Sequence, residues 1–173
     1  MTLQTHLYLT GYRGTGKTTV ARRLARHFNV AIVDLDERIE QVAGKTILEI
    51  FESSGEAGFR DLETQALSDL SQTPSIVSLG GGAVLRAENR EQIAKTGTCV
   101  WLDADAETIA RRLDHDSTTT DRRPALTTLN DLDEIRHLLA ERRATYQSVA
   151  QHRVETSGLS VEEVVQQIVA FVS

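Results

Sequence analysis

The segment from Leu7 to Thr19 constrains this chain most, because it joins a short apolar run to a helical pattern through a glycine-rich turn. The turn reads Gly11-Tyr12-Arg13-Gly14-Thr15-Gly16-Lys17-Thr18-Thr19. Glycines let the backbone turn tightly and bring successive N–H groups to phosphate oxygens, while the following helix presents the positive end of its dipole. The lysine supplies a mobile positive charge, and the hydroxyl after it suits the Mg²⁺ that bridges the outer phosphates. The alternative is a glycine-rich connection without a ligand, but the flanking strand and helix are the context that a phosphate-binding loop requires.

Length and charge bound the class of protein. The 173 residues are 40% hydrophobic and contain no linker, so we expect one domain over residues 1–173 with one core. The 19 basic and 25 acidic residues argue against a general nucleic-acid or membrane-surface binder, which needs a basic face. The single cysteine, Cys99, excludes an intramolecular disulfide. We find no signal peptide and no apolar run long enough to span a membrane, which predicts a cytoplasmic protein.

Hydrophobic periodicity predicts an alternation of strands and helices. We expect strands at 7–9, 31–36, 75–79, 99–102 and 153–156, the second of them buried on both faces. Helices are expected at 17–28, 36–43, 46–51, 55–71, 87–95, 105–113, 132–149 and 161–172, with Gly97 closing the helix at 87–95. This order predicts a three-layer α/β fold with a five-stranded parallel sheet. Ligands of such folds bind beyond the carboxyl ends of the strands.

Residues 114–130 break the pattern. They are polar, lack an apolar stripe and centre on Arg122-Arg123-Pro124. A segment of this length inside a compact domain is typical of a functional lid.

Asp34 and Asp36 follow the second predicted strand, close to the proposed phosphates. One of them can hold Mg²⁺, usually through water, and the other can orient an attacking hydroxyl or accept its proton. The alternative is structural: Asp36 would cap a helix, and Asp34 would be an ordinary polar residue at the edge of the sheet.

Three further features involve backbone or arginine. Three consecutive glycines, Gly80-Gly81-Gly82, lose much backbone entropy on folding. They are therefore expected where the backbone must approach another group closely, although a flexible turn is the simpler explanation. Arg142 lies in the middle of an apolar helical stripe and should point inward, where it needs an anionic partner, either a protein carboxylate or the acid group of a substrate. Arg60 remains undecided, because Glu56 and Glu63 could form ordinary surface ion pairs with it.

Taken together, these motifs resemble those of the shikimate kinase family over nearly the whole chain. The resemblance is carried by the phosphate-binding loop, Asp34-Leu35-Asp36, Gly58-Phe59-Arg60 with Glu63, Gly80-Gly81-Gly82, Arg123-Pro124, and Arg142 with Tyr146 and Ala150. As is typical of that family, the Walker B acid is missing from the third strand, where Ser78 stands instead. The resemblance implies a P-loop kinase fold with a mobile lid, acting as a monomer. It also implies that the enzyme uses ATP and Mg²⁺ to phosphorylate the 3-hydroxyl of shikimate in aromatic amino-acid biosynthesis.

The resemblance also implies a role for each motif residue. The catalytic residues would be Lys17, Asp36 and Arg123. ATP would be bound by Gly14, Thr15, Gly16, Lys17, Thr18, Thr19, Arg112 and Arg123, with Arg112 against adenine. Mg²⁺ would be held by Thr18 and Asp34. Shikimate would be bound by Asp36, Arg60, Gly80, Gly81, Gly82 and Arg142, with the two arginines and a Gly81 backbone group clamping its carboxylate.

Two other functions share parts of this pattern. A kinase for another small acid such as gluconate, or for a nucleoside monophosphate, would have the same loop and lid, but two inward arginines favour a carboxylate over a nucleobase. A nucleotide-binding regulatory module would not phosphorylate a metabolite, and the set of Asp36, Arg60 and Arg142 has no purpose in a switch. The Asn-Lys-x-Asp motif of guanine-specific GTPases is absent from the sequence.

Overall fold

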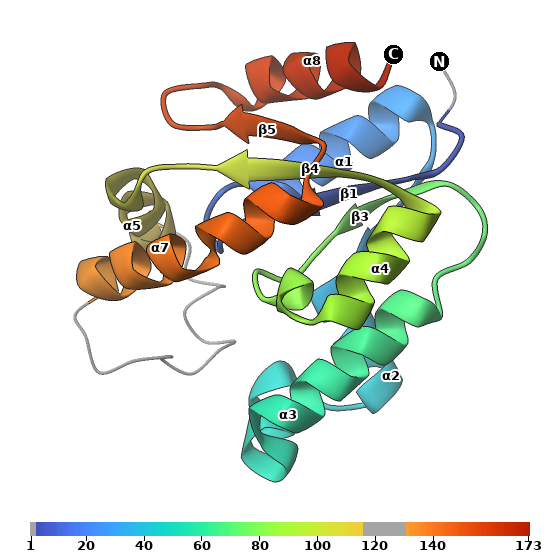
Figure 1. The fold of residues 1–173 in the computed structure, drawn as a ribbon, viewed down its shortest axis with the longest axis vertical. Coiled ribbons are helices and arrows are strands. Elements are labelled where there is room, and N and C mark those ends of the chain that lie inside the picture. Colours follow the sequence, from blue (N-terminus) through green and yellow to red (C-terminus); the bar gives the residue numbers. More distant parts are fainter. Residues whose placement is uncertain (1–2, 116–130) are drawn as a thin grey trace.

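The structure is a computed structural model that describes residues 3–115 and 131–173. Within these ranges, five strands form one parallel sheet in the order β2-β3-β1-β4-β5, which confirms the predicted sheet (Figure 1). The strands are β1 (His6–Thr10), β2 (Ala31–Asp34), β3 (Ser75–Ser78), β4 (Gly97–Asp103) and β5 (His152–Glu155).

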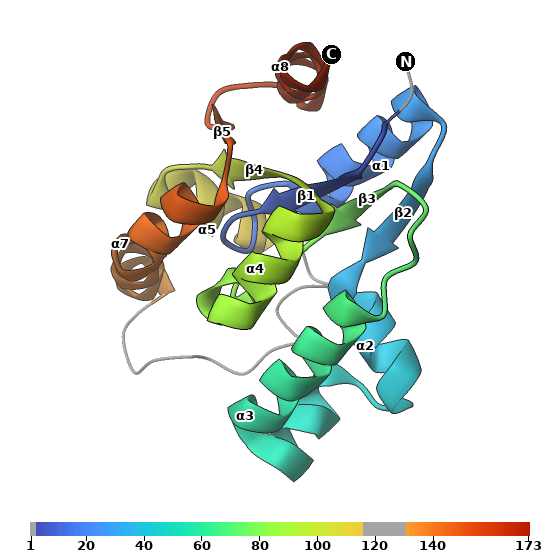
Figure 2. The same cartoon turned by 45° about the vertical axis from the view of Figure 1, so that its right-hand side comes forward.

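Helices cover both faces of this sheet and give the three predicted layers (Figure 2). They are α1 (Lys17–Phe28), α2 (Leu35–Ala43), α3 (Ile47–Ser68), α4 (Ala87–Thr96), α5 (Ala106–His115), α7 (Asp131–Val149) and α8 (Val161–Val172), with a 3₁₀ turn η1 (Ala83–Leu85). α1 and α8 pack on one face, and α2, α3, α4 and α7 pack on the other. Over the two described ranges, we find no helix with the length and apolar character needed to cross a membrane.

The alternation of side chains along each strand builds the two cores. On β1, Leu7 and Leu9 face α1 and α8, whereas Tyr8 faces the opposite core. Cys99 and Trp101 on β4 join Tyr8 in that second core, and the Cys99 thiol is buried there. A smaller third core joins α5 and α7 around Tyr12, which follows β1.

The prediction that the second strand is buried on both faces is wrong. β2 lies at the edge of the sheet, and its first two residues, Ala31 and Ile32, are exposed. An apolar run predicts a strand equally well at the centre and at the edge of a sheet, so the sequence did not distinguish the two positions.

Element ends also differ from expectation. α2 begins at Leu35, one residue early, because Asp34 caps it. α3 contains the two helices expected at 46–51 and 55–71, because its backbone is non-helical at Gly55, where φ is 66° and ψ is −173° and the predicted break lies. Its end at Ser68 comes three residues before the expected end at residue 71. Gly97 follows α4 but already begins β4. Asp114 and His115 of the predicted lid belong to α5, and the rest of that lid lies outside the described residues.

Candidate active site

The loop between β1 and α1 holds three glycines with positive φ, which are Gly11 (138°), Gly14 (77°) and Gly16 (95°). A Cβ on Gly11 would overlap the backbone carbonyl of Leu102 on β4, so only glycine fits there. Gly16 is the N-cap of α1, and no side chain caps this end of the helix. An anion on the loop would therefore meet the first backbone N–H groups of α1 together with the positive end of its dipole.

Lys17 begins α1 and turns its side chain back over the loop. Its Nζ donates hydrogen bonds to the carbonyl oxygens of Gly11 and Tyr12, each at 2.8 Å. Hydrogen bonds from an ammonium to an anion are stronger than those to a neutral carbonyl. A phosphate on the loop would therefore compete effectively for this ammonium group.

Thr18 and Asp34 meet at the carboxyl ends of the strands. The Thr18 hydroxyl donates to Asp34 Oδ2 at 2.9 Å and lies 3.4 Å from the Ser78 hydroxyl. Asp34 Oδ1 accepts from the backbone N–H groups of Asp36 and Glu37, at 3.1 and 3.4 Å, and so caps α2. The structural alternative named the wrong residue, because Asp34 rather than Asp36 is the cap.

These oxygen donors suit Mg²⁺. Magnesium prefers oxygen ligands, and it usually takes one or two carboxylates together with substrate phosphates and water instead of an all-protein cage. Among the described residues, no group of three or more His, Cys, Asp or Glu side chains could hold a metal ion. Thr18 and Asp34 place one hydroxyl and one carboxylate side by side, which is the kind of donor that Mg²⁺ accepts.

The loop and both aspartates line a cavity of about 430 Å³. The predicted site residues along its wall are Gly14, Thr15, Gly16, Lys17, Thr18, Thr19, Asp34, Asp36, Gly80, Gly81 and Arg112. Part of the wall is apolar and was not predicted as a site, namely Val20, Ile47, Leu79, Leu113, Leu159, Val161 and Val164. The last two lie in the helix predicted at 161–172, and hydrophobic periodicity carries no signal that separates a cavity wall from a core.

Arg112 connects three segments around this cavity. Its guanidinium donates to the hydroxyl and the carbonyl oxygen of Thr156, at 3.0 and 2.9 Å, and makes a longer bond of 3.4 Å to the Gly14 carbonyl. Burial, with Arg111 nearby, lowers the pKa of Arg112. Thr156 was not singled out in the sequence, because a lone threonine after a strand carries no distinguishing pattern.

Arg60 on α3 forms a buried ion pair with Glu63, and not the ordinary surface pair that the sequence left open. Its guanidinium donates to Glu63 at 2.8 Å and to Glu56 at 3.3 Å. Arg60 is 8% exposed and Glu63 is 0% exposed. Burial opposes the charge on Arg60, but the two glutamates outweigh it and raise the pKa of this arginine. Spacings of three and four residues on a helix occur equally in solvated and buried pairs, so the burial of this pair was not visible in the sequence.

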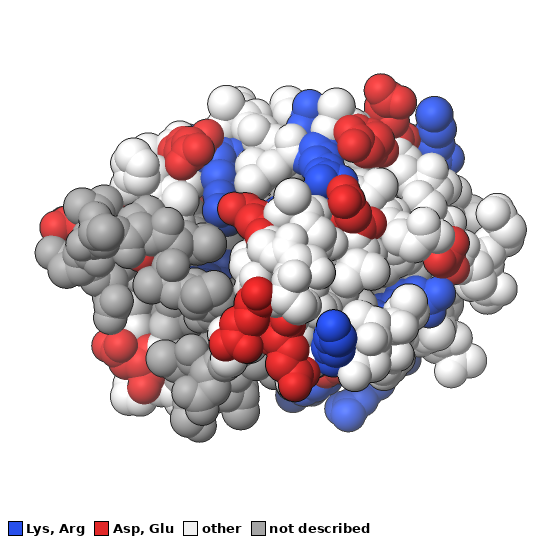
Figure 3. Space-filling model, turned by 90° about the horizontal axis from the view of Figure 1, so that it is seen from below, with Lys and Arg blue, Asp and Glu red and all other residues white. Residues whose placement is uncertain are grey.

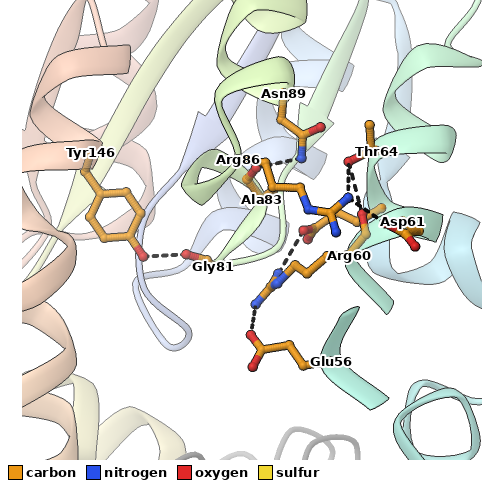
Figure 4. Close-up of polar contacts among 10 residues, drawn as sticks. Glu56, Arg60, Asp61, Thr64, Gly81, Ala83, Arg86, Asn89 and Tyr146 are labelled. Atoms are coloured by element: carbon orange, nitrogen blue, oxygen red, sulfur yellow. Dashed lines mark hydrogen bonds and ion pairs between the residues drawn. The ribbon is translucent and has the colours of Figure 1, made fainter. Parts of the chain in front are cut away.

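The triple glycine is shaped to this arginine. A Cβ on Gly82 would overlap the Arg60 guanidinium, so the glycine allows a close approach, which is one of the two explanations that the sequence left open. Arg86, at the start of α4, bonds Thr64 and Asp61 on α3 and fixes the same loop against the same helix (Figure 4).

Arg142 points inward from α7, as predicted, and is 9% exposed. Its guanidinium lies 6.0 Å from the centre of the Tyr12 ring. Across residues 3–115 and 131–173, we find no carboxylate in an ion pair with it. The sequence left open whether Arg142 pairs with a protein carboxylate or with the acid group of a substrate. Among the described residues, no protein carboxylate forms that pair.

Tyr146 brings the two predicted arginines to one place. It is 0% exposed, and its hydroxyl donates to the Gly81 carbonyl at 2.6 Å (Figure 4). Burial raises the pKa of Tyr146 to about 12, although the positive charges of Arg142 and Arg60 both act to lower it. Arg60 and Arg142, which do not line the cavity themselves, thus lie near one phenol beside Gly81, which does.

Basic and acidic side chains are interspersed on the face seen from below (Figure 3). Positive charge on this described surface is therefore not gathered into one broad field. Arg123, the predicted lid residue, lies outside the described residues.

Comparison with known proteins gives one consistent family. A sequence model of that family, described as shikimate kinase, matches residues 13–173. A shikimate kinase of Rhodopirellula baltica is 46% identical over 164 residues, which cover 94% of this chain and 88% of the relative. A shikimate kinase of Corynebacterium diphtheriae is 40% identical over 94% of this chain and 91% of its own.

Solved structures agree with the sequence comparison. The structure of a shikimate kinase from Acinetobacter baumannii in complex with shikimate superposes with a TM-score of 0.88 and 36% identity, over 97% of this chain and 92% of the other. A gluconokinase from Sinorhizobium meliloti reaches a TM-score of 0.59 at 15% identity, which indicates a shared fold only.

Proposed function

The chain belongs to the shikimate kinase family, and on this premise we propose that it transfers the γ-phosphoryl group of ATP to the 3-hydroxyl of shikimate. One observation carries the proposal. The phosphate-loop cavity and the pair of inward arginines meet at Gly81, so a site for phosphates adjoins a site for a carboxylate.

Each group of site residues would act on a different part of the two substrates. Backbone N–H groups of the loop, with Lys17, would bind the outer phosphates of ATP and stabilise charge on the group in transfer. Asp36 would accept a hydrogen bond from the 3-hydroxyl and orient it in line with the γ-phosphorus. Arg112 would lie against the adenine. Transfer of this kind depends on positioning and electrostatics, which these fixed groups supply.

Thr18 and Asp34 would hold Mg²⁺ between the loop and β2. When bound, the ion would supply positive charge that offsets the negative charge of the outer phosphates. Asp34 is suited to this role because α2 fixes one of its oxygens as a cap and leaves Oδ2 on the Thr18 side.

Arg60, Arg142 and the Gly80-Gly81-Gly82 backbone would bind the shikimate carboxylate. Arg142 favours this role, because a buried guanidinium without a protein carboxylate among the described residues gains most from an acid group of the substrate. We further infer that the lid arginine, Arg123, reaches the phosphates on closure, and that the enzyme acts as a cytoplasmic monomer.

A coupled assay of ADP release tests the function. The purified protein is given ATP and Mg²⁺ with shikimate, gluconate, a nucleoside monophosphate or no acceptor, and the product is identified by phosphorus NMR. We expect ADP release to require shikimate and to match the formation of shikimate 3-phosphate. Turnover with another acceptor, but none with shikimate, would instead favour a different small-molecule kinase, and nucleotide binding without any turnover would favour a regulatory module.

A further inference from the structure

The middle carbonyl of the triple glycine is held differently from its neighbours. The carbonyls of Gly80 and Gly82 accept from the backbone N–H groups of Ala83 and Leu85, at 3.0 and 3.1 Å, inside the turn of η1. The Gly81 carbonyl instead accepts from the Tyr146 hydroxyl on α7, 65 residues away (Figure 4). The loop therefore builds its own turn, but a distant helix fixes its centre.

The peptide that joins Gly81 to Gly82 contacts residues of both helices that carry the arginines. Its oxygen is bonded to Tyr146, which follows Arg142 by one helical turn. At its other end, Gly82 packs against the Arg60 guanidinium. Because a peptide unit is planar, holding the Gly81 oxygen also sets the direction of the N–H group in the same peptide, which is that of Gly82. One hydrogen bond thus influences both the backbone of the loop and its placement relative to the arginines.

We propose that Tyr146 is a positioning residue of the acid site, whose hydroxyl holds the triple-glycine loop where the Gly81 backbone, Arg60 and Arg142 converge on one carboxylate. This inference rests on the proposed function. It assigns Tyr146 no contact with the substrate, and its effect should appear in substrate binding before it appears in the transfer step.

The glycine loop needs a contact that fixes its conformation, and Tyr146 is held rigidly enough to provide it. Consecutive glycines have the greatest backbone freedom of any residues, so one hydrogen bond can bias their conformation. The Tyr146 ring stacks on Trp101 with centroids 5.8 Å apart. Asn89 fixes the far side of the loop through a bond of 2.8 Å to the Ala83 carbonyl, which leaves the centre to Tyr146.

Tyr8 offers a matched control. It is buried in the same core as Tyr146, and its hydroxyl bonds the Thr96 hydroxyl at 2.7 Å. Burial raises the pKa of both tyrosines, so both hydroxyls stay protonated at neutral pH. Thr96 ends α4 and belongs to no predicted part of the site. Replacing either tyrosine by phenylalanine removes one buried hydroxyl and keeps the ring.

The experiment compares Tyr146→Phe with Tyr8→Phe in steady-state kinetics, alongside melting curves. We expect Tyr146→Phe to raise the KM for shikimate by about three- to tenfold, the effect of one neutral hydrogen bond, with little change in the KM for ATP. Tyr8→Phe should lower the melting temperature about as much as Tyr146→Phe does. It should leave the KM values for shikimate and ATP unchanged. A KM does not depend on the amount of folded enzyme, so partial unfolding of either variant does not obscure the result.

The methyl ester of shikimate makes the test specific for the acid group. If Tyr146 positions the clamp, Tyr146→Phe should weaken the binding of shikimate more than that of its ester, measured by calorimetric titration. Equal weakening of acid and ester, or equal shikimate KM values in the two phenylalanine variants, would overturn the positioning role. A wild-type protein that does not turn over shikimate would overturn the proposed function itself, which separates the two failures.

Discussion

The nucleotide side and the acid side of the site are built in opposite ways. The loop from Gly11 to Thr18 is one continuous segment whose backbone supplies most of its donors. The acid side draws Arg60 from α3, Gly81 from the loop after β3 and Arg142 from α7, which are separated by up to 82 residues. A continuous site depends on local conformation, whereas an assembled one depends on the packing of the whole domain.

The positive charges on the two sides also differ in their partners. Lys17 bonds two neutral carbonyls of its own loop, whereas Arg60 is paired with a fully buried glutamate. Arg142 has neither arrangement among the described residues, where its guanidinium lies 6.0 Å from the centre of the Tyr12 ring and its charge acts to lower the raised pKa of the Tyr146 phenol. These differences predict that loss of each cation should affect turnover, stability and binding to different degrees.

Removal of the loop cation should have the largest effect. In Lys17→Ala we expect kcat to fall by about 10³-fold or more, because a donor aimed at developing charge in the transition state is lost. The two hydrogen bonds that the structure describes for Lys17 go to carbonyls that water can also satisfy, so their loss should change the melting temperature little. Lys95→Ala, at an exposed position on α4, is the matched control. Turnover close to wild type in a folded Lys17→Ala variant would contradict the assignment of the loop.

Removal of Arg60 should affect stability as well as binding. Arg60→Ala leaves the buried Glu63 carboxylate without its 2.8 Å partner, and breaking a buried pair in this way costs about 3 kcal/mol. Chemical denaturation should show this loss, together with a weaker affinity for shikimate. The double variant Arg60→Ala/Glu63→Ala should recover part of the stability but none of the affinity. An unchanged unfolding free energy in Arg60→Ala would show that the pair is not structural.

Local motifs made the nucleotide side predictable. The sequence placed the loop, its lysine and its threonine between the first strand and the first helix, where the structure has them, because glycine spacing encodes backbone shape directly. Their roles in binding stay predictions. Asp34 was harder, since an aspartate after a strand can cap a helix or bind a metal, and here it caps α2 while facing Thr18. The sequence gives no sign of such a double contact.

Tertiary packing decided the rest. The burial of Arg60 with Glu63 and the bond from Tyr146 to Gly81 both depend on how α3 and α7 lie against the triple glycine. The edge position of β2 depends on strand order, which alternation along one strand does not reveal. Helix spacing did predict the inward direction of Arg142, because Ile135 and Tyr146 share its stripe.

Removal of Arg142 should separate binding from stability. A charged hydrogen bond to the substrate contributes roughly 1.5–3 kcal/mol, so Arg142→Ala should weaken shikimate binding by about ten- to a hundredfold. ATP affinity and the melting temperature should change little, since no described carboxylate is left unpaired. Arg143→Ala is the control one residue along, at a side chain 58% exposed. A large loss of stability with equal weakening of both substrates would refute the clamp.

The smallest effect concerns alkaline pH and all three tyrosines, one on the loop, one in the core and one at the acid side. Burial raises the pKa of Tyr8, Tyr12 and Tyr146, the last to about 12. A raised pKa means that folding favours the neutral phenol, so the stability from each phenol is complete below its ordinary pKa near 10, and that from Tyr146 is lost as the pH rises towards 12. Near pH 11 the Tyr146 phenol alone should lower the free energy of unfolding by about 1.4 kcal/mol, and at neutral pH it should not change that energy.

Ultraviolet titration should therefore show phenolate only as the chain unfolds. The stability of Tyr146→Phe should fall less steeply between pH 10 and 12 than that of the wild type. Phenolate absorbance with an ordinary midpoint near pH 10 in the folded protein would show that these phenols reach solvent, and it would remove the rigid hydroxyl on which the acid side of the comparison depends.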